Sequence, residues 1–433
     1  MRIIKADAVE FEDFFHQLRR RGGAFTPELL STVMEIVRDV ADRGDAAVFD
    51  YTAKFDHYEL SSATVEVTEE EKKAALSLVQ PEDMDVIALA ALRIEKYHKN
   101  QTAQSWLNAN EEGVEVGQRI LPLERIGVYA PGGKAVYPST ILMAAIPARI
   151  AGVQEIILVT PSKDGTLNPL IAAAAKVSGV NRIFKIGGAQ AIAALAYGTK
   201  TIPRVDKIVG PGNAYVAAAK KLVFGQVDID MIAGPSEVVV IADKTARAAF
   251  AAADLLAQLE HDEMAAAVLL TPDENLAYEV SREVERQMEA LSRTAIIEKS
   301  KARYGAIIIT VDIDQAIELS NIFAPEHLEL MVENPAGDLS KVRNAGSVFL
   351  GSFTPEAMGD YMAGTNHILP TEGTARFSSP LGVYDFVKRM SVLRFTPEAL
   401  SKLGRKTAHF ARMEGLDAHA NSIDVRLNNA KKG

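Results

Sequence analysis

The chain of 433 residues carries 47 lysines and arginines against 57 acidic residues, a formal net charge of −10 that argues against general affinity for nucleic acid or anionic membranes. Its hydrophobic content of 48% is that of a globular protein, and its length exceeds what one hydrophobic core usually supports, so we expect two or more domains. The chain has no cysteine, which excludes disulfides, iron–sulfur clusters, thiolate zinc sites and cysteine nucleophiles, so any zinc would need nitrogen and oxygen ligands.

The sequence also predicts a soluble, cytoplasmic protein. Residues 1–10 lack the basic region and the apolar run of a signal peptide. No other stretch has enough uninterrupted apolar residues to span a bilayer. We therefore expect no membrane partner and no nucleic-acid partner.

The first hundred residues predict helices. Thr26 followed by Pro27 is a typical helix start, and Thr68 with Glu71 three residues later forms a capping box. A further helical pattern covers 83–100. This part of the chain is expected to serve as scaffold.

From Arg125 onward, short apolar runs that end in glycine or proline alternate with alanine-rich helical stretches. The first series has strands at 126–129, 156–159, 183–186 and 208–209, with helices beginning near 139, 168, 189 and 213. A second series has strands at 238–241, 267–270 and 307–309, with helices at 244–260 and 275–291. Strands that are apolar throughout and alternate with helices predict parallel sheets buried on both faces, and hence two α/β domains.

The last part of the chain breaks this alternation. Residues 359–379 are rich in Gly, Thr, Ser and Pro without apolar periodicity, which predicts a long loop of the kind that often carries function. From Leu381 the pattern is helical again and predicts a small C-terminal helical unit.

Gln258 and His261 are the first candidate ligands. They are three residues apart near the end of the helix predicted at 244–260, so both side chains lie on one face. A glutamine oxygen and an imidazole nitrogen can both bind zinc. An ordinary polar helix end would give the same pattern.

Glu326 and His327 follow Ala-Pro and precede an alternating apolar stretch, which places them where a loop enters a strand. Both side chains can act as proton acceptors when burial brings their pKa values near neutrality. An exposed turn would equally account for this pair.

Four more polar residues lie in contexts that permit either function or solvent exposure. Asp360 opens the irregular stretch and His367 lies within it, whereas Glu414 and His419 lie five residues apart near the C-terminus. An aspartate beside glycine is commonly a turn former, and the other three fit solvated loops or helix ends. The chain has only eight histidines, so their gathering in such positions is suggestive.

Two glycine clusters lie between a predicted strand and a predicted helix. Gly187-Gly188 and Gly210-Pro211-Gly212-Asn213 could each cradle a phosphate at a helix N-terminus. Neither completes the dinucleotide-binding pattern, because Tyr215 occupies the position of the third glycine. Structural turns remain an alternative.

Taken in chain order, these segments resemble the histidinol dehydrogenase family. The resemblance covers the chain from about residue 120 to its end and is carried by RIGVYAPGG (125–133), GGAQAI (187–192), VGPGNAYV (209–216), AGPSE (233–237), QLEHD (258–262), APEHLE (324–329), GTNHILP (364–370) and EGLDAH (414–419). It implies oxidation of L-histidinol to L-histidine through the aldehyde, with one Zn²⁺ in each active site and two NAD.

The resemblance also implies roles for individual residues. Gln258, His261, Asp360 and His419 match the zinc ligands. Glu326 and His327 match the two proton acceptors. Substrate contacts are implied for these ligands and for His327, together with Ser236, His367 and Glu414. NAD contacts are implied for Tyr129, Gln190 and Asn213.

The same resemblance implies an aldehyde-dehydrogenase-like architecture and an intertwined homodimer whose C-terminal units complete each other's active sites. We accordingly expect four parts: a helical arm at 1–25, a first α/β domain with the zinc ligands and proton acceptors at 26–125 and 236–380, an NAD-binding α/β domain at 126–235, and an exchanged C-terminal helical unit at 381–433.

Two rival interpretations remain. A related zinc and NAD dehydrogenase could act on another alcohol, such as a sulfonated diol, although His367 and Glu414 match the histidinol pattern. A nucleotide-binding regulatory protein could use the same scaffold without chemistry, but the adjacent Glu326 and His327 disfavour it.

Overall fold

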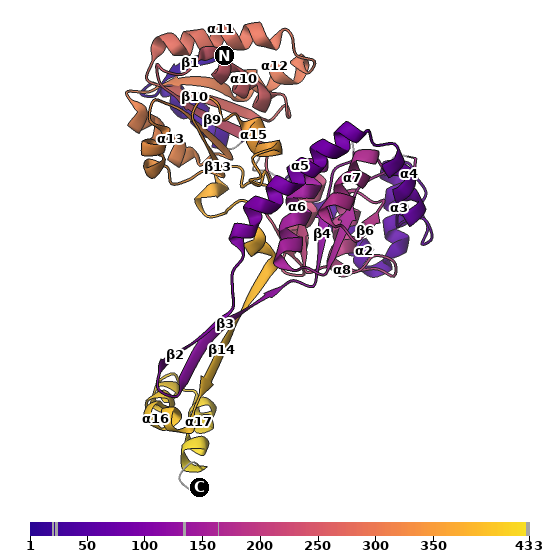
Figure 1. Cartoon of the computed structure of the whole chain (residues 1–433), viewed down its shortest axis with the longest axis vertical. Helices are drawn as coiled ribbons and strands as arrows, with labels where there is room; N and C mark the ends of the chain where they lie inside the picture. The colour runs from indigo at the N-terminus through magenta and orange to yellow at the C-terminus, as the bar shows by residue number, and fades with distance from the viewer. Residues whose placement is uncertain (20, 22–24, 133–135, 163, 430–433) are drawn as a thin grey trace. The chain divides into compact units, whose positions relative to one another are not determined.

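The computed structural model describes residues 1–19, 21, 25–132, 136–162 and 164–429. The chain divides into two compact units (Figure 1). The α/β unit comprises Met1–Gln101 and Leu123–Phe386, and the small unit comprises Thr102–Pro122 and Val387–Gly433. Among the described helices, none combines the length and the apolar character that crossing a bilayer requires.

A six-stranded sheet forms one half of the α/β unit, and all its neighbouring strands run parallel. In spatial order it contains β1 (Arg2–Lys5), β11 (Gly305–Ile309), β10 (Ala266–Thr271), β9 (Glu237–Ala242), β12 (His327–Met331) and β13 (Ser347–Leu350). The strands predicted at 238–241, 267–270 and 307–309 are thereby confirmed.

Helices cover both faces of this sheet because side chains alternate along each strand. Val238 and Val240 face the helices α10 (Ala248–Leu259), α11 (Glu274–Met288) and α12 (Thr294–Tyr304). Val239 and Ile241 face the helices α1 (Val9–Arg19) and α13 (Ile313–Phe323). A further short turn, α14 (Pro335–Asp338) with η2 (Leu339–Lys341), connects β12 to β13.

The N-terminal residues differ from the helical arm expected at 1–25. Residues 2–5 form β1, an edge strand of the six-stranded sheet, and Phe11, Phe14 and Leu18 of α1 are buried against that sheet. A four-residue strand next to a helix is too short to show a period, so the sequence pattern could not reveal it. Residues 20 and 22–24 of this stretch lie outside the described residues.

A five-stranded parallel sheet forms the other half of the α/β unit. In spatial order it contains β6 (Arg182–Phe184), β5 (Glu155–Val159), β4 (Arg125–Tyr129), β7 (Lys207–Val209) and β8 (Asp228–Ile229). The connecting helices are α6 (Pro138–Ala151), α7 (Pro169–Ser178), α8 (Gly188–Tyr197) and α9 (Ala214–Val223). The first predicted strand–helix series is thereby confirmed.

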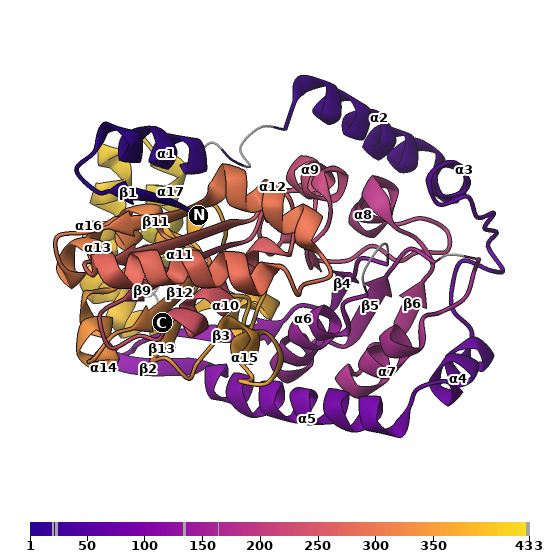
Figure 2. The same cartoon turned by 90° about the horizontal axis from the view of Figure 1, so that it is seen from above.

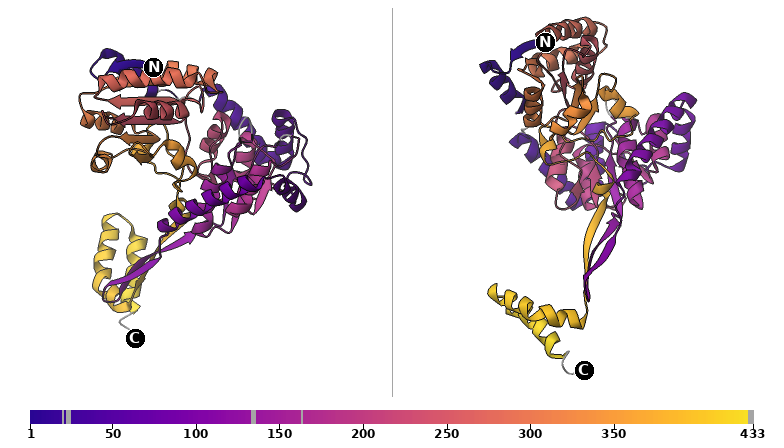
Figure 3. Two further views of the ribbon diagram at one scale, coloured as in Figure 1. Left: turned by 45° about the horizontal axis from the view of Figure 1, so that its top comes forward. Right: turned by 60° about the vertical axis from the view of Figure 1, so that its left-hand side comes forward.

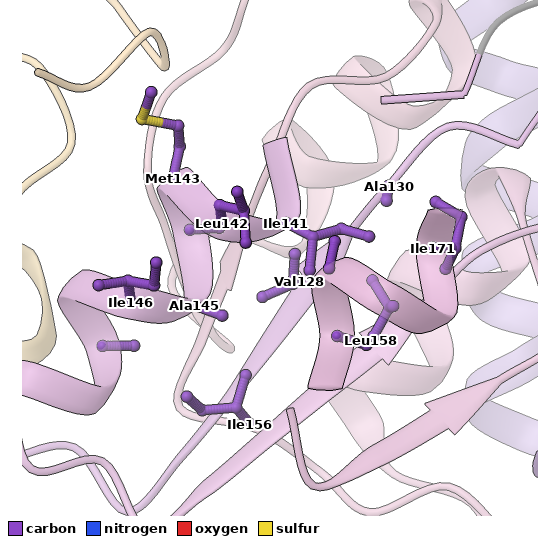
Figure 4. Close-up of a cluster of buried hydrophobic side chains, with 14 of the residues drawn as sticks. Val128, Ala130, Ile141, Leu142, Met143, Ala145, Ile146, Ile156, Leu158 and Ile171 are labelled. Carbon is purple, nitrogen blue, oxygen red and sulfur yellow. The ribbon is translucent and has the colours of Figure 1, made fainter. Parts of the chain in front are cut away.

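One face of this second sheet packs on α6 and α7 through a dense aliphatic core (Figure 4). Val128, Ile156 and Leu158 of the strands meet Ile141 and other residues of α6, and all four side chains are almost fully buried. Such close packing fixes the strand ends from which the loops of the unit emerge.

The helices of the first hundred residues are α2 (Pro27–Arg43), α3 (Asp45–Asp56), α4 (Glu69–Ser77) and α5 (Pro81–His98), followed by η1 (Lys99–Gln101). The predicted starts are confirmed, because Thr26 caps α2 and the Thr68–Glu71 capping box is formed at α4. Asn168 and Asn213 likewise cap α7 and α9 through their side chains.

These helices pack on the five-stranded sheet. The sequence had predicted instead that 26–125 belongs to the same domain as 236–380. Helices α2 and α3 share a core with α8 and α9, and α4 and α5 share one with α6 and α7 (Figure 2). The residues before α4 add to the sheet edge, since Val67 N donates to Ile183 O and Lys185 N donates to Val65 O. Backbone pairing and apolar burial therefore join this segment to the sheet of 126–235.

The small unit contains an antiparallel sheet that the sequence analysis missed. It consists of β14 (Val387–Phe395), β3 (Val114–Pro122) and β2 (Trp106–Glu111), followed by α16 (Pro397–Met413) and α17 (Asp417–Asn429). Figure 3 shows its strands as a long twisted ribbon. Helix was predicted from Leu381, but η4 (Val383–Phe386) and the nine residues of β14 precede α16 because residues 114–122 supply a full-length pairing partner.

Candidate active site

The pair Glu326 and His327 lies where the chain enters β12, as predicted. β12 pairs with β9, and the register places His327 opposite Val238. Ser236 and Glu326 immediately precede their strands. The pair therefore lies at the amino end of β12, beside the amino end of the neighbouring strand β9.

The turn before β12 is held in an unusual conformation. Ala324 has φ of 52°, in the left-handed region, which costs on the order of 1 kcal/mol for a residue other than glycine. Two backbone hydrogen bonds hold the turn, from Gly346 N to Pro325 O and from Ser347 N to Glu326 O, both 2.9 Å. β13 thus fixes the approach of the chain to Glu326 and His327.

Alternation along β12 separates its apolar residues from its polar residues. Leu328 and Leu330 point into the core that contains α13. His327 and Glu329 are on the other face, with Met331, which packs in the core that contains α10. One strand therefore anchors the core and presents two ionisable groups.

Helix α10 adds polar side chains on that same face. Asp254 and Gln258 are four residues apart and so share one side of the helix. Gln258 is fully buried. His261 was predicted within the helix, but α10 ends at Leu259 and His261 lies beyond it, with an exposed side chain and its backbone N donating to Gln258 O.

Helix α15 (Glu356–Tyr361) supplies the third set of side chains. Asp360 was predicted to open a loop, yet it lies in this helix, four residues after Glu356 and on the same side. The backbone N of Glu356 donates to Glu329 Oε1 at 2.9 Å, which ties the start of α15 to β12. Gly359 allows close packing, because a Cβ there would lie 2.5 Å from the ring of Phe349. The rest of the predicted loop is irregular except for η3 (Thr374–Arg376).

His327 lies among acidic groups from all three elements. Its Nδ1 is 3.7 Å from Glu356 Oε1 and 3.8 Å from Glu326 Oε2, and its Nε2 is 3.8 Å from Asp360 Oδ1. Its Nδ1 also lies 3.2 Å from the carbonyl oxygen of Glu237. Nε2 is buried and has no hydrogen-bond partner within the described part of the chain, as expected of an atom that meets a ligand.

These neighbours determine the proton affinities in the site. Burial disfavours the charged imidazole, but the carboxylates of Glu356, Glu326 and Asp360 outweigh burial and hold the pKa of His327 well above its usual range. Burial raises the pKa of Glu326 and raises the pKa of Glu356 to about 8. Buried ionisable groups whose pKa values are displaced by their neighbours are typical of sites of acid–base chemistry.

Glu326 is oriented by its neighbours. Its Oε2 accepts a hydrogen bond from Glu237 N at 3.1 Å, and its carboxyl also bonds the side chain of Ser236. Glu237 is buried and paired with the buried Arg21 at 2.7 Å. Because Arg21 lies at the end of the N-terminal segment, that segment contributes to the support of the site.

Three side chains beside His327 form a group that could hold a metal ion. One ligand atom from each of His261, Glu356 and Asp360 lies within 4.8 Å of the others. The amide nitrogen of Gln258, in its hydrogen-bonding orientation, lies 3.2 Å from both oxygens of Glu356. The structure therefore brings together three of the four predicted ligands, and their nitrogen and oxygen donors suit zinc.

The remaining predicted substrate residue of the α/β unit approaches from a different segment. His367 is half-buried, and its Nε2 lies 3.4 Å from Thr140 Oγ1 of α6. The neighbouring Asn366 donates to the carbonyl oxygen of Met143 at 2.7 Å. These contacts fix the segment that carries His367 against α6.

The predicted NAD contacts lie at the carboxyl ends of strands in the five-stranded sheet. Tyr129 ends β4, Gln190 lies in the first turn of α8, and Asn213 caps α9. Tyr129 accepts a hydrogen bond from Gly188 N at 3.2 Å. Gln190 is buried, and no described residue partners its Oε1, which leaves that atom available to a ligand. Carboxyl ends of parallel strands are the usual place for ligands in such sheets.

Buried charges support the glycine turn before Asn213. Lys220 donates to Gly210 O at 3.0 Å and pairs with Asp230, whose carboxylate accepts from Gly210 N at 2.7 Å. A Cβ on Gly210 would lie 2.2 Å from the carbonyl oxygen of Tyr129. Close packing therefore accounts for Gly210. This agrees with the alternative that the glycine cluster forms a structural turn.

Glu414 and His419 lie in the small unit. Glu414 follows α16 and His419 is in the first turn of α17, and both side chains are exposed. They therefore belong to a different unit from Gln258, His261 and Asp360, which lie in the α/β unit.

The sequence analysis missed several acidic residues of the site. Glu329 follows His327 by two residues in a strand, Asp254 precedes Gln258 by four in a helix, and Glu356 precedes Asp360 by four in another helix. Each therefore lies on the same face as a predicted residue. Extending the strand and helix periods from the predicted residues would have identified all three.

Comparison with known proteins identifies the family of this chain. The family model described as histidinol dehydrogenase matches residues 19–427. The chain belongs to the histidinol dehydrogenase family. The family resemblance inferred from the motifs is thereby confirmed.

Individual relatives support the assignment over the whole chain. The histidinol dehydrogenase of Syntrophotalea carbinolica is 52% identical over 427 residues, with 99% of each chain covered. That of Geobacter sulfurreducens is 51% identical over 428 residues and covers 99% of this chain and 100% of its own. The crystal structure of histidinol dehydrogenase from Elizabethkingia anophelis superposes with a TM-score of 0.94 at 39% identity, covering 100% of this chain and 99% of the other.

The turn before β12 gives a first prediction. In Gly346→Ala the new Cβ would lie 2.6 Å from the carbonyl oxygen of Glu326, so Glu326 and His327 must shift. We expect kcat to fall at least about tenfold, since small displacements of reacting groups are costly. Gly351→Ala is the control beside the same strand: Gly351, unlike Gly346, has positive φ, and a Cβ there meets nothing within 4 Å, so its effect reports backbone strain alone. A fall of equal size in both variants would contradict this prediction.

Proposed function

We propose that this protein oxidises L-histidinol to L-histidine through the bound aldehyde, reducing two NAD. The observation that supports this most is the position of His327, whose Nδ1 lies near the carboxylates of Glu326 and Glu356 and whose Nε2 lies near Asp360. Glu356 and Asp360 belong, with His261, to the group that could hold a metal ion. Proton acceptors thus adjoin a group that can hold a metal ion. Because the chain belongs to the histidinol dehydrogenase family, we infer that histidinol is the substrate and NAD the cofactor.

The described residues fit one Zn²⁺ in each active site. Gln258, His261 and Asp360 would hold it from the α/β unit, and His419 would be the fourth ligand. When bound, the metal would hold the imidazole and amino groups of the substrate and offset part of the negative charge around His327. The buried amide of Gln258 and the cluster of ligand atoms support this assignment.

Two residues would move the protons. His327 would accept the proton of the substrate hydroxyl as hydride leaves for the nicotinamide. Glu326, held by Glu237 N and by Ser236, would then deprotonate a water molecule that adds to the aldehyde. Oxidation of the resulting hydrate gives the carboxylate, a route that needs no cysteine, and the chain has none.

The remaining predicted contacts would orient the two organic molecules. Ser236 and His367 would contact the substrate from the α/β unit, and Glu414 would contact it from the small unit. Tyr129, Gln190 and Asn213 would contact NAD. The unpartnered Oε1 of the buried Gln190 supports a ligand there.

We further propose that two chains exchange their small units in a homodimer. Among the described residues of the small unit, the buried ones are Ala399, Gly404, Ala408 and Ala420, all of them small. Its exposed apolar side chains include Trp106, Leu107, Met390, Val392, Leu393, Phe395, Phe410 and Met413. A fold of this size needs a larger apolar core, so a second copy would supply the missing cover.

The rival interpretations receive no support from the comparisons. The curated relatives described above carry the name histidinol dehydrogenase over nearly their full length. A dehydrogenase acting on a sulfonated diol is therefore disfavoured, and so is a regulatory protein. The cytoplasmic location stays a prediction from the sequence.

Activity with histidinol tests the proposal directly. The purified chain loaded with zinc should produce two NADH for each histidinol consumed. In Glu326→Gln the rate should fall by roughly 10²–10⁴-fold, the usual contribution of a general base. Oxidation of added histidinal should fall at least as much, because Glu326 serves the second step. Wild-type enzyme that produces no NADH would refute the function, and unchanged histidinal oxidation in the variant would refute the role of Glu326.

Removal of a metal ligand gives a separate prediction. His261→Asn should lower zinc affinity by more than the roughly 10–100-fold that outer-sphere residues contribute, with parallel loss of activity. Zinc bound per chain, measured against a competing chelator, checks this. Since His261 is exposed at the end of α10, the fold should persist in circular dichroism. Normal activity without bound metal would contradict the zinc assignment.

Mixed dimers test the exchange of the small units. Combining Glu326→Gln chains with His419→Asn chains should give one intact site in each heterodimer if His419 acts across the dimer, and so about half of wild-type activity. Combining Glu326→Gln with His261→Asn is the control, because both residues lie in the α/β unit and no intact site can form. Lack of rescue in verified heterodimers would place His419 in the site of its own chain.

A further inference from the structure

Glu356 contacts a predicted metal ligand, although neither the motifs nor the assigned roles include it. In the orientation of the Gln258 amide that allows hydrogen bonding, its nitrogen lies 3.2 Å from both carboxylate oxygens of Glu356. Glu356 and Gln258 are 4% and 0% exposed, so bulk water does not compete for this contact. The contact joins the start of α15 to the last turn of α10.

We propose that Glu356 is a positioning residue for the metal site, which sets the Gln258 amide so that its oxygen, and not its nitrogen, faces the metal. The inference rests on the proposed zinc site. A glutamine side chain has nearly the same shape in both amide orientations, yet only the oxygen can bind a cation. A buried amide therefore needs a neighbour that favours one orientation.

A carboxylate is well suited to this task. In its ionised form, which a nearby metal ion favours, it only accepts hydrogen bonds, so it holds the NH₂ group and disfavours the orientation in which the amide oxygen would face it. A charged acceptor also forms stronger hydrogen bonds than a neutral one. Partners of this kind often orient metal ligands from the outer shell of a site.

The backbone at Glu356 is itself fixed. Glu356 N donates to Glu329 Oε1 at 2.9 Å, and the carboxyl of Glu329 interacts with the carboxyl of Asp254 on α10. Asp254 and Gln258 lie on one side of α10. The same helix therefore contacts Glu329 through Asp254 and Glu356 through Gln258. The carboxylate of Glu356 is thereby held at a defined position beside Gln258.

Direct ligation is the competing role for Glu356, since one of its oxygens lies within 4.8 Å of ligand atoms of His261 and Asp360. The two roles differ in their dependence on Gln258. A residue that orients the amide has no further effect once the amide is absent. A direct ligand contributes to zinc affinity whether or not the Gln258 amide is present.

A double-mutant cycle on zinc affinity distinguishes the two roles. We would measure the zinc dissociation constants of the wild-type chain, Glu356→Gln, Gln258→Ala and the double variant by competition with a chelator. Glu356→Gln should weaken zinc binding by roughly 10–100-fold with Gln258 present and by less than about threefold in Gln258→Ala. Equal losses in both backgrounds, or no loss in either, would overturn the proposal.

Two further measurements keep the test independent of folding and of the proposed function. Glu71→Gln, which removes a carboxylate paired with Lys185 far from this contact in the chain, should leave zinc affinity unchanged. If Glu356→Gln does not fold, Glu356→Asp replaces it in the test. Its shorter side chain keeps a carboxylate acceptor, so we expect a loss of zinc affinity that is smaller than the one predicted for Glu356→Gln. A wild-type chain that binds no zinc would instead refute the proposed metal site.

Discussion

Strand β12 must satisfy opposite demands on its two faces, and the site depends on how it does so. Leu328 and Leu330 are buried in the core beneath α13, and their burial sets the register in which His327 and Glu329 face α10 and α15. A slip by one residue would place the charged groups in the apolar core. The hydrophobic effect that stabilises the six-stranded sheet thus also orients the imidazole of His327.

That orientation concentrates negative charge. Glu326, Glu329 and Glu356 are buried close together and share only a few positive neighbours, chiefly His327, while Arg21 compensates the adjacent Glu237. Burial of like charges raises carboxyl pKa values and favours binding of a cation. The same concentration of buried carboxylates therefore makes the site receptive to a metal ion and to a cationic substrate.

Much of this was predictable from the sequence, because strand and helix periods are local properties. The parallel strands, the caps at Thr26 and Thr68, and the position of Glu326 and His327 all follow from such patterns. The packing partner of α2–α5 was not predictable, because an amphipathic helix does not specify which sheet covers it. β14 was missed because its pairing partner lies about 270 residues earlier in the chain. Glu356 could have been found from the helix period that it shares with Asp360, but its contact with Gln258 joins two helices and is not visible in the sequence.

The two sheets of the α/β unit use opposite edges. Tyr129 and Asn213 follow the carboxyl ends of β4 and β7, whereas Ser236 and Glu326 precede the amino ends of β9 and β12. A parallel sheet directs its helix N-termini to the carboxyl edge, which suits phosphate groups. The amino edge instead receives helix C-termini, such as the end of α10 with Gln258 and His261, whose partial negative charge suits a cation. The proposed division between an anionic nucleotide at one sheet and a metal-bound substrate at the other is thus consistent with the polarity of the strands.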